Sequence, residues 1–449
     1  MVFSKIYYYK YLLLLFILIV SNKVLAEDTI GDQQRQQNVW QQKQLRERQE
    51  TNKSVNLTTK IAESDIKFSI ESPCIVIDRL LLTSTDGLDI LIDYPWLLTA
   101  AQTDTHDNDD PFLGQCIGST GVSLIMRRMQ NVLIEKGLIT STVVAPPQDL
   151  TKGTLKLILV MGEIRYIRFS ETSQKNVNLS RAIPIQEGSQ LNIRDMEQGL
   201  ENLKRVPTVE ADIQVLPAAG DTAKAGQSDL EVSWQQNKKN RFAWSVDDAG
   251  SDSTGKYKAS LTWSKDNPLQ ASDLFYVTLN STLGNENYNY SRGVTSHYSI
   301  PTGYWLLSIT GGQSTYLQTV VGFTQNYHYS GTSNNGEVKL SRLLTRDADS
   351  KLQVYGAGWS RASADYINDV EIAVQRRRTA GLDLGLTYSR AIGQSKWDIE
   401  VKYRVGTGAL ASLEVPEAAF GEGTSRPRIL TLDATVETPF TFLEHPFKY

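Results

Sequence analysis

From residue 237 onward, the sequence consists of short segments in which apolar and polar residues alternate. Examples are Phe242–Val246, Tyr257–Trp263 and Phe275–Leu279, and polar turns rich in Gly, Asn, Asp and Ser separate them. A period of two indicates β-strands with one apolar face. Segments of about ten residues with aromatic ends are typical of transmembrane β-barrels. The pattern predicts an antiparallel β-barrel over residues 237–449, with a soluble β-sandwich or propeller as the alternative.

The first 26 residues have the order of a secretory signal peptide. Lys5 and Lys10 flank a Tyr-rich start, an apolar run extends from Leu12 to Val20, and small residues end at Ala26. The run is shorter than the ~20 residues of a membrane-spanning helix, so we expect cleavage after Ala26 rather than a retained anchor. No later stretch reaches ~18 apolar residues, so any membrane function must come from strands.

Composition excludes several classes of function. The 46 basic and 50 acidic side chains give a net charge of −4, without the basic excess of a nucleic-acid binder. Four His and two Cys cannot build the usual zinc sites, and no nucleotide-binding glycine motif is present. We therefore expect no enzyme and no cofactor. In an exported chain, Cys74 and Cys116 are most economically one disulfide, with two separate buried thiols as the alternative.

Residues 27–52 are expected to form a polar helix. Between residues 33 and 50 its only apolar side chains are Val39, Trp40 and Leu45, and Gly and Pro are absent. Such a helix has no wide hydrophobic stripe and must be solvated or lie in a wet environment. Residues 53–67 follow as a polar linker.

Two similar α/β units occupy residues 68–163 and 164–236. In the first we expect strands and helices over 74–82, 88–101, 122–137, 138–144 and 154–163. In the second we expect them over 164–169, 179–185, 192–204, 209–215 and 229–234. Both have the order β-α-α-β-β, and such a tandem repeat favours a docking region over a catalytic core.

Five stretches carry a resemblance to a known family. Ser72-Pro73-Cys74 and Gln115–Gly118, followed by a helix ending at Gly137, are similar to a first POTRA (polypeptide-transport-associated) domain with its disulfide. Gly188–Leu200 is similar to a second POTRA domain. Ser291–Val294 and Tyr298–Trp305 are similar to an early barrel hairpin. The chain thus resembles the two-partner secretion transporters, the haemolysin activator family of ShlB, FhaC and HecB.

The resemblance implies two α+β POTRA domains in the periplasm, followed by a barrel in the bacterial outer membrane. The polar helix would then be the plug inside the barrel. The implied function is export of a haemolysin, haemagglutinin or contact-dependent toxin, recognised through its N-terminal secretion domain. Outer-membrane lipid and the barrel-assembly machinery are the other implied partners, and neither nucleic acid nor nucleotide is among them.

The sequence departs from the family pattern in the barrel. The family has sixteen strands and a Val-Arg-Gly-Tyr/Phe loop that folds back into the pore, and no such tetrad occurs here. About ten to twelve alternating segments precede Tyr449. We therefore expect an incomplete barrel.

The order of the α/β units predicts where a client binds. If the third strand of each unit is central, the second is an edge that can accept an added strand from an extended polypeptide. The candidate edge residues are Leu138, Ile139, Val143 and Val144 in the first unit and Val209, Ile213 and Val215 in the second.

Two rival functions remain at this point. His297, Ser299 and Asp273 could form the triad of an outer-membrane hydrolase, but their spacing has no mechanistic specificity. A barrel-assembly factor would share the POTRA modules, although the cysteine pair and the Gln-rich helix favour secretion.

Overall fold

The computed structural model describes residues 46, 49, 55–57, 67–69, 71–103, 109–251, 253–284, 289–442 and 445–448. The predicted signal peptide lies outside the described residues, as do Val39, Trp40 and Leu45 of the predicted plug helix. Among the described helices, none is both long and apolar enough to cross a membrane.

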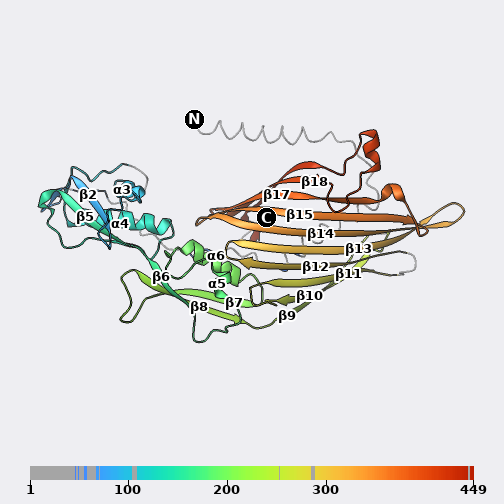
Figure 1. Ribbon diagram of the computed structural model, residues 1–449, viewed down its shortest axis with the longest axis horizontal. Coiled ribbons are helices and arrows are strands. Elements are labelled where there is room, and N and C mark those ends of the chain that lie inside the picture. Colours follow the sequence, from blue (N-terminus) through green and yellow to red (C-terminus); the bar gives the residue numbers. More distant parts are fainter. Residues whose placement is uncertain are drawn as a thin grey trace. The chain divides into compact units, whose positions relative to one another are not determined.

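The first α/β unit is a three-stranded sheet packed against two helices (Figure 1). Its elements are β1 (Ile75–Val76), β2 (Arg79–Ser84), α3 (Pro95–Ala101), β3 (Cys116–Ile117), α4 (Ser119–Glu135), β4 (Thr142–Val144), the 3-10 turn η1 (Leu150–Lys152) and β5 (Thr154–Val160). The sheet order is β2-β5-β4, so β4 is an edge strand. The core includes Leu82, Leu97, Ile125, Leu133 and Leu157. The predicted order of elements is confirmed.

A disulfide and a carboxylate fasten the start of this unit to α4. Cys74 and Cys116 form the predicted disulfide. The Glu71 carboxylate accepts the backbone N–H of Thr120 at 3.0 Å and that of Gly121 at 2.6 Å. These N–H groups belong to the first helical turn and have no partner within the helix, so the carboxylate stabilises the helix start.

The second strand of this unit is shorter than predicted. It begins at Thr142, so Leu138 and Ile139 lie outside it. Gly137 adopts a φ of +87°, and the Leu138 N–H then bonds a carbonyl in the last turn of α4. This helix-ending geometry turns the chain back before it can extend, and Leu138 is buried in the core instead.

Two further predicted boundaries of this unit are wrong. The strand expected over 74–82 is two strands, because β1 pairs with β3 whereas β2 pairs with β5. Between them, the N–H groups of Asp78 and Arg79 both donate to the Gly153 carbonyl. The helix expected from Leu88 begins at Pro95, a residue suited to the first helical turn because its missing N–H costs nothing there.

The second α/β unit has the same order. Its elements are β6 (Glu163–Phe169), α5 (Leu179–Ala182), α6 (Ile193–Leu203), β7 (Val209–Pro217) and β8 (Gln227–Gln236). The sheet order is β6-β8-β7, so β7 is an edge strand. Asn192 caps α6 as predicted, since its side chain accepts the Arg194 N–H at 2.9 Å. Met196, Leu200 and Leu203 lie buried in the core of this unit.

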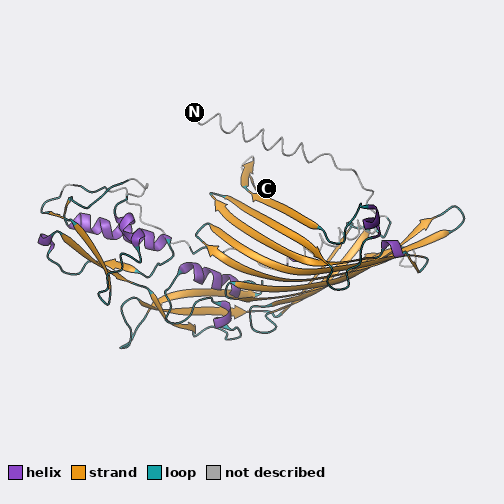
Figure 2. Cartoon of the chain, turned by 45° about the horizontal axis from the view of Figure 1, so that its top comes forward, coloured by secondary structure: helices purple, strands orange, loops and turns teal. Residues whose placement is uncertain are grey.

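The rest of the described chain forms an antiparallel sheet of eleven strands. Ten lie side by side in chain order: β9 (Asn240–Asp247), β10 (Tyr257–Asp266), β11 (Leu274–Leu283), β12 (Tyr290–Thr302), β13 (Trp305–Val321), β14 (Asn326–Arg346), β15 (Ser350–Ile367), β17 (Arg377–Ile392), β18 (Ser395–Thr407) and β19 (Arg428–Glu437). β16 (Val370–Glu371) pairs with β15, and β20 (Pro439–Phe442) pairs with β21 (His445–Lys448); two 3-10 turns, η2 (Ala373–Gln375) and η3 (Pro416–Phe420), complete the elements. Figure 2 shows the sheet curving across its strands. Within the described residues its end strands, β9 and β19, are not paired with each other.

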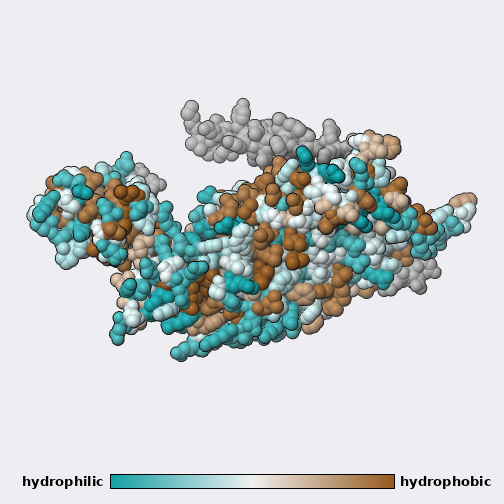
Figure 3. Space-filling model, in the orientation of Figure 1, coloured by the Kyte–Doolittle hydropathy of each residue, from teal (hydrophilic) through white to brown (hydrophobic). Residues whose placement is uncertain are grey.

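The two faces of this sheet have reversed polarity compared with a soluble protein. On one face, which we call the apolar face, large side chains are exposed, and Leu382 and Leu384 keep 58% and 64% of their area accessible. On the other, which we call the polar face, Thr262 and Thr278 are buried and their hydroxyls lie 2.9 Å apart. Figure 3 shows apolar residues gathered over the strands of the large sheet. An exposed apolar face of this extent fits contact with lipid.

The disulfide closes a loop with a sequence separation of 42, so it should stabilise the first α/β unit. We expect the double substitution Cys74→Ser/Cys116→Ser to lower the free energy of unfolding of that unit by about 4 kcal/mol, because the unfolded chain regains loop entropy. Chemical denaturation monitored by hydrogen exchange in α4 measures this. Reduced wild-type protein should behave like the double variant, and equal stability of the oxidised and serine forms would contradict the prediction.

Candidate functional site

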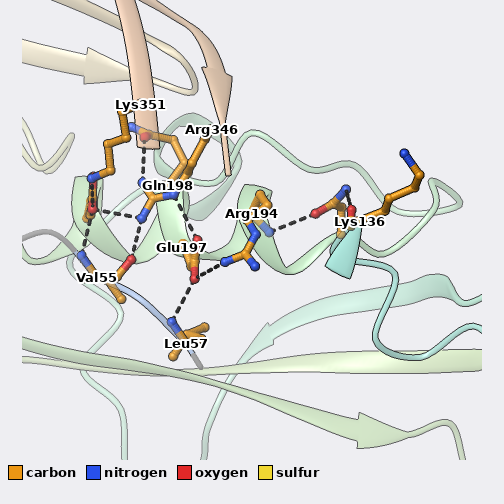
Figure 4. Close-up of polar contacts among 10 residues, drawn as sticks. Val55, Leu57, Lys136, Arg194, Glu197, Gln198, Arg346 and Lys351 are labelled. Atoms are coloured by element: carbon orange, nitrogen blue, oxygen red, sulfur yellow. Dashed lines mark hydrogen bonds and ion pairs between the residues drawn. The ribbon is translucent and has the colours of Figure 1, made fainter. Parts of the chain in front are cut away.

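Helix α6 is buried on two sides, and this makes it the centre of the candidate site. Its apolar side belongs to the core of the second unit. Its polar side carries Glu197 and Glu201, one helical turn apart, which contact the ends of β14 and β15 and the linker residues 55–57 (Figure 4). Segments far apart in the sequence therefore meet on one face of one helix.

Glu197 is a fully buried carboxylate with three donors. It accepts hydrogen bonds from Arg346 Nε at 2.9 Å, from Arg194 Nη1 at 2.9 Å and from the Leu57 backbone N–H at 2.8 Å. Burying a charge is costly unless it is paired and hydrogen-bonded, and Glu197 has both compensations. The Arg346 side chain is itself 3% exposed, so the two ions depend on each other.

Glu201 repeats the arrangement one turn further along α6. Its Oε1 accepts from Arg346 Nη2 at 2.9 Å, from Lys351 Nζ at 2.5 Å and from the Val55 backbone N–H at 2.7 Å. Arg346 Nη2 also donates to the Val55 carbonyl. Burial raises the pKa of Glu201, but the hydrogen bonds and charges of Arg346 and Lys351 outweigh it and hold the pKa below its usual value. Glu201 is therefore charged at neutral pH.

A second set of contacts joins α5 and α6 to the turn between β12 and β13. The Asn202 amide donates to the Ala182 carbonyl at 2.7 Å and to the Gly303 carbonyl at 2.8 Å. The Gly303 N–H donates to the Arg181 carbonyl at 2.8 Å, and the Tyr304 hydroxyl bonds Asp195. Burial raises the pKa of Asp195, although the Tyr304 bond opposes the shift. The second unit is thus held to the sheet at two separate turns.

The edge strand β7 has backbone groups that point away from its sheet. Backbone bonds from Ala218 to Gln227 and from Asn237 to Thr208 show that the even-numbered residues face β8. The backbone N–H and C=O groups of successive residues point to opposite sides of a strand. Those of Ala211, Ile213 and Val215 therefore point outward, away from β8. Within the described residues, no hydrogen bond occupies them.

The edge strand β4 offers a shorter surface. The Gln148 side chain makes two 2.7 Å bonds to the backbone of Lys156, so the even-numbered residues of β5 face β4. With the register Val143↔Leu159, Val143 is then the one residue of this strand whose backbone points outward. Of the predicted edge residues, Val143 and Val144 lie in β4, and Val209, Ile213 and Val215 lie in β7.

Two described residues of the predicted plug helix contact the polar face of the large sheet. Arg46 and Gln49 are helical, and Gln49 Oε1 accepts from Ser264 Oγ at 2.8 Å and from Arg241 Nη1 at 2.9 Å. Arg46 Nη2 lies 3.4 Å from Ser308 Oγ. A polar helix is compatible with this face because the face itself is polar.

The three residues considered for a hydrolase triad each have a different partner. His297 Nδ1 lies 2.8 Å from Thr310 Oγ1, Ser299 Oγ accepts from Arg205 at 2.7 Å, and Asp273 accepts from the Tyr298 hydroxyl at 2.9 Å. These contacts join neighbouring strands of the sheet to one another and to the segment that follows α6, and they do not build a charge relay.

Sequence reasoning missed Arg346, Glu197 and Glu201. The two glutamates could have been noticed as a pair one turn apart on the polar side of a helix whose other side is apolar. Nothing in the sequence marks Arg346, because it lies at the end of a strand, 149 residues from its partner.

Comparison with known proteins identifies relatives of both parts of the chain. Residues 226–449 match the family model described as haemolysin secretion/activation protein ShlB/FhaC/HecB. Residues 163–217 match a POTRA domain, and residues 102–162 match a POTRA domain of ShlB type. The outer membrane transporter CdiB-2 of Burkholderia pseudomallei is 34% identical over 385 residues, covering 84% of this chain and 65% of that protein. The hemolysin transporter protein ShlB of Serratia marcescens is 30% identical over 203 residues, covering 45% and 35%.

Solved structures agree with the sequence matches. CdiB from Acinetobacter baumannii is similar with a TM-score of 0.77 and 27% identity, covering 94% of this chain and 76% of that one. CdiB from Escherichia coli has the same fold, with a TM-score of 0.79 and 22% identity, covering 93% and 75%. The chain spans 65% of the length of the Burkholderia relative and 58% of the CdiB of Dickeya dadantii.

Removing one partner of the buried Glu197–Arg346 pair should strongly destabilise the junction between α6 and the ends of β14 and β15. We expect Arg346→Ala to destabilise it by about 3–5 kcal/mol, because a buried carboxylate loses its main counter-charge. Hydrogen exchange of the α6 amides measures the effect. Arg342→Ala, which removes an exposed arginine of the same strand, is the control and should change exchange little. Equal exchange in the two variants would contradict the prediction.

Proposed function

Because the chain belongs to the ShlB/FhaC/HecB family of haemolysin secretion/activation proteins, we propose that it is the outer-membrane transporter of a two-partner secretion system. Its client is a secreted exoprotein of haemolysin, haemagglutinin or contact-dependent-toxin type. The observation that carries the proposal is the combination of tandem POTRA domains with a family-matched sheet whose apolar face is exposed.

The domain roles follow the predicted organisation. Residues 68–163 and 164–236 are the periplasmic POTRA domains, and residues 237–449 contribute the barrel wall. The reversed polarity of the large sheet supports this, because an apolar outer face suits lipid and a polar inner face suits a passing polypeptide. The contacts of Arg46 and Gln49 with the polar face support a plug helix in residues 27–52.

The client docks in extended form at the POTRA edge strands. The outward-pointing backbone groups of β7 support this mode, because an added strand gains main-chain hydrogen bonds whatever its sequence. β7 offers three such residues and β4 one, so the second POTRA domain carries the larger docking edge. The apolar residues Val209, Ile213 and Val215 alternate with the exposed Glu210 and Asp212 along this edge.

The work of transport is binding and passage, not catalysis. Three features support this: the relatives are named transporters, the candidate triad residues have structural partners, and the sequence lacks a nucleotide-binding motif. Folding of the client outside the cell can draw it forward without a nucleotide.

Blocking the edge of β7 should abolish client binding. We expect Val215→Pro to remove an outward N–H and leave the ladder to β8 intact, so the domain folds but no longer accepts an added strand. Gln214→Pro is the matched control, because it removes an N–H that faces β8 and should destabilise the sheet. Binding of a haemolysin-type secretion domain and thermal unfolding are measured together. Wild-type binding by a folded Val215→Pro protein would rule out docking at this edge.

The apolar face of the large sheet should lie in lipid. We expect Leu384→Lys to destabilise the membrane-inserted protein by about 2–4 kcal/mol if the site lies near the bilayer midplane. Leu269→Lys is the matched control: this leucine is 67% exposed, close to the 64% of Leu384, but lies in the turn between β10 and β11. Unfolding from lipid vesicles measures both. Equal effects would place the face in water.

A further inference from the structure

The spacing of Glu197 and Glu201 matches the backbone of an extended chain. Four residues along an α-helix advance about 6.0 Å, and two residues along an extended strand advance about 6.6 Å. Glu197 accepts the N–H of Leu57 at 2.8 Å, and Glu201 accepts the N–H of Val55 at 2.7 Å. Two carboxylates one helical turn apart therefore bind alternate N–H groups of one extended segment.

We propose that the Glu197–Glu201 pair, with Arg346, is a binding site for the backbone of an extended polypeptide, and that residues 55–57 of the linker are its tethered occupant. The ligand class follows from the contacts. The site binds two N–H groups and, through Arg346, the Val55 carbonyl. Every residue of a peptide has a backbone carbonyl, and every residue except proline has a backbone N–H. Recognition is therefore tolerant of sequence.

The side chains of the occupant add a simple requirement. Val55 and Leu57 pack against the core of the second POTRA domain. Alternate residues of an extended segment point to the same face, so a ligand needs apolar residues at every second position. A client strand that alternates apolar and polar residues meets this requirement.

Occupation by the linker makes the site self-inhibited. A tethered segment has an effective concentration in the millimolar range, so a free ligand must compete with it. This step rests on the proposed function: the extended client displaces residues 55–57 from α6, which couples client capture to release of the linker.

The test uses the full chain and a labelled peptide with the sequence of residues 51–61. In the variant Val55→Pro/Leu57→Pro the tethered linker loses both N–H donors, and hydrogen bonds to charged groups are strong. We expect the peptide to bind this variant at least about tenfold more tightly than it binds the wild type. The control Thr59→Pro/Ala62→Pro places two prolines outside residues 55–57 and should bind like the wild type. A peptide with proline at the positions of Val55 and Leu57 should bind none of them.

A second readout requires no peptide. Trypsin cleaves after Lys53 and Lys60, on either side of the docked residues. Cleavage should be several-fold faster in Val55→Pro/Leu57→Pro than in the wild type. Adding the secretion domain of a haemolysin-type exoprotein should accelerate cleavage of the wild type.

The outcomes separate the site from the proposed function. Equal peptide affinity for the wild type and Val55→Pro/Leu57→Pro, or equal binding of the proline peptide, overturns the site. If the peptide results hold and the secretion domain binds without accelerating cleavage, displacement by the client is overturned. If the secretion domain does not bind at all, the proposed function fails while the backbone site stands.

Discussion

The buried ion pair between Glu197 and Arg346 is the interaction on which the rest of the structure depends. Neither ion is tolerable in its buried position alone, so the second POTRA domain and the β14–β15 end of the sheet must come together to satisfy both. The Leu57 N–H and Arg194 complete the coordination of the carboxylate. A buried pair of this kind adds little net stability compared with an apolar contact, but it tolerates few alternative arrangements. The ion pair thus determines the geometry of the contact between the second POTRA domain and the sheet more than it adds to the stability of that contact.

Two different solvents explain the opposite polarity of the two halves. In the α/β units, apolar residues such as Leu133 and Leu200 are buried between helices and sheet, as water requires. In the large sheet, Leu384 is exposed and Thr278 is buried. The same alternation of apolar and polar residues therefore accompanies buried apolar side chains in the α/β units and exposed ones in the large sheet. The surroundings of a strand decide which of its faces is buried.

Sequence reasoning predicted the features that depend on local pattern. The period of two and the Asn192 cap are confirmed, because each follows from residues close together in the chain. The edge position of the second strand is also confirmed, but it depends on pairing between the first and third strands of each unit, which are distant in the sequence. The start of β4 was predicted too early, because a left-handed Gly137 adds a turn that hydrophobicity does not reveal. The junction could not be predicted, because Arg346 and Glu197 meet only after two domains have folded.

The proline at the end of β7 has a consequence for pairing between the edge strands of two copies of the protein. A free strand edge invites pairing with any other free edge, including that of a second copy. Pro217 falls at an outward-pointing position, where it ends the run of available N–H groups without breaking the sheet. Glu210 and Asp212 add like charges that would face each other if two such edges met antiparallel. Pro217 and these two carboxylates therefore disfavour pairing of this edge with a second copy of the chain.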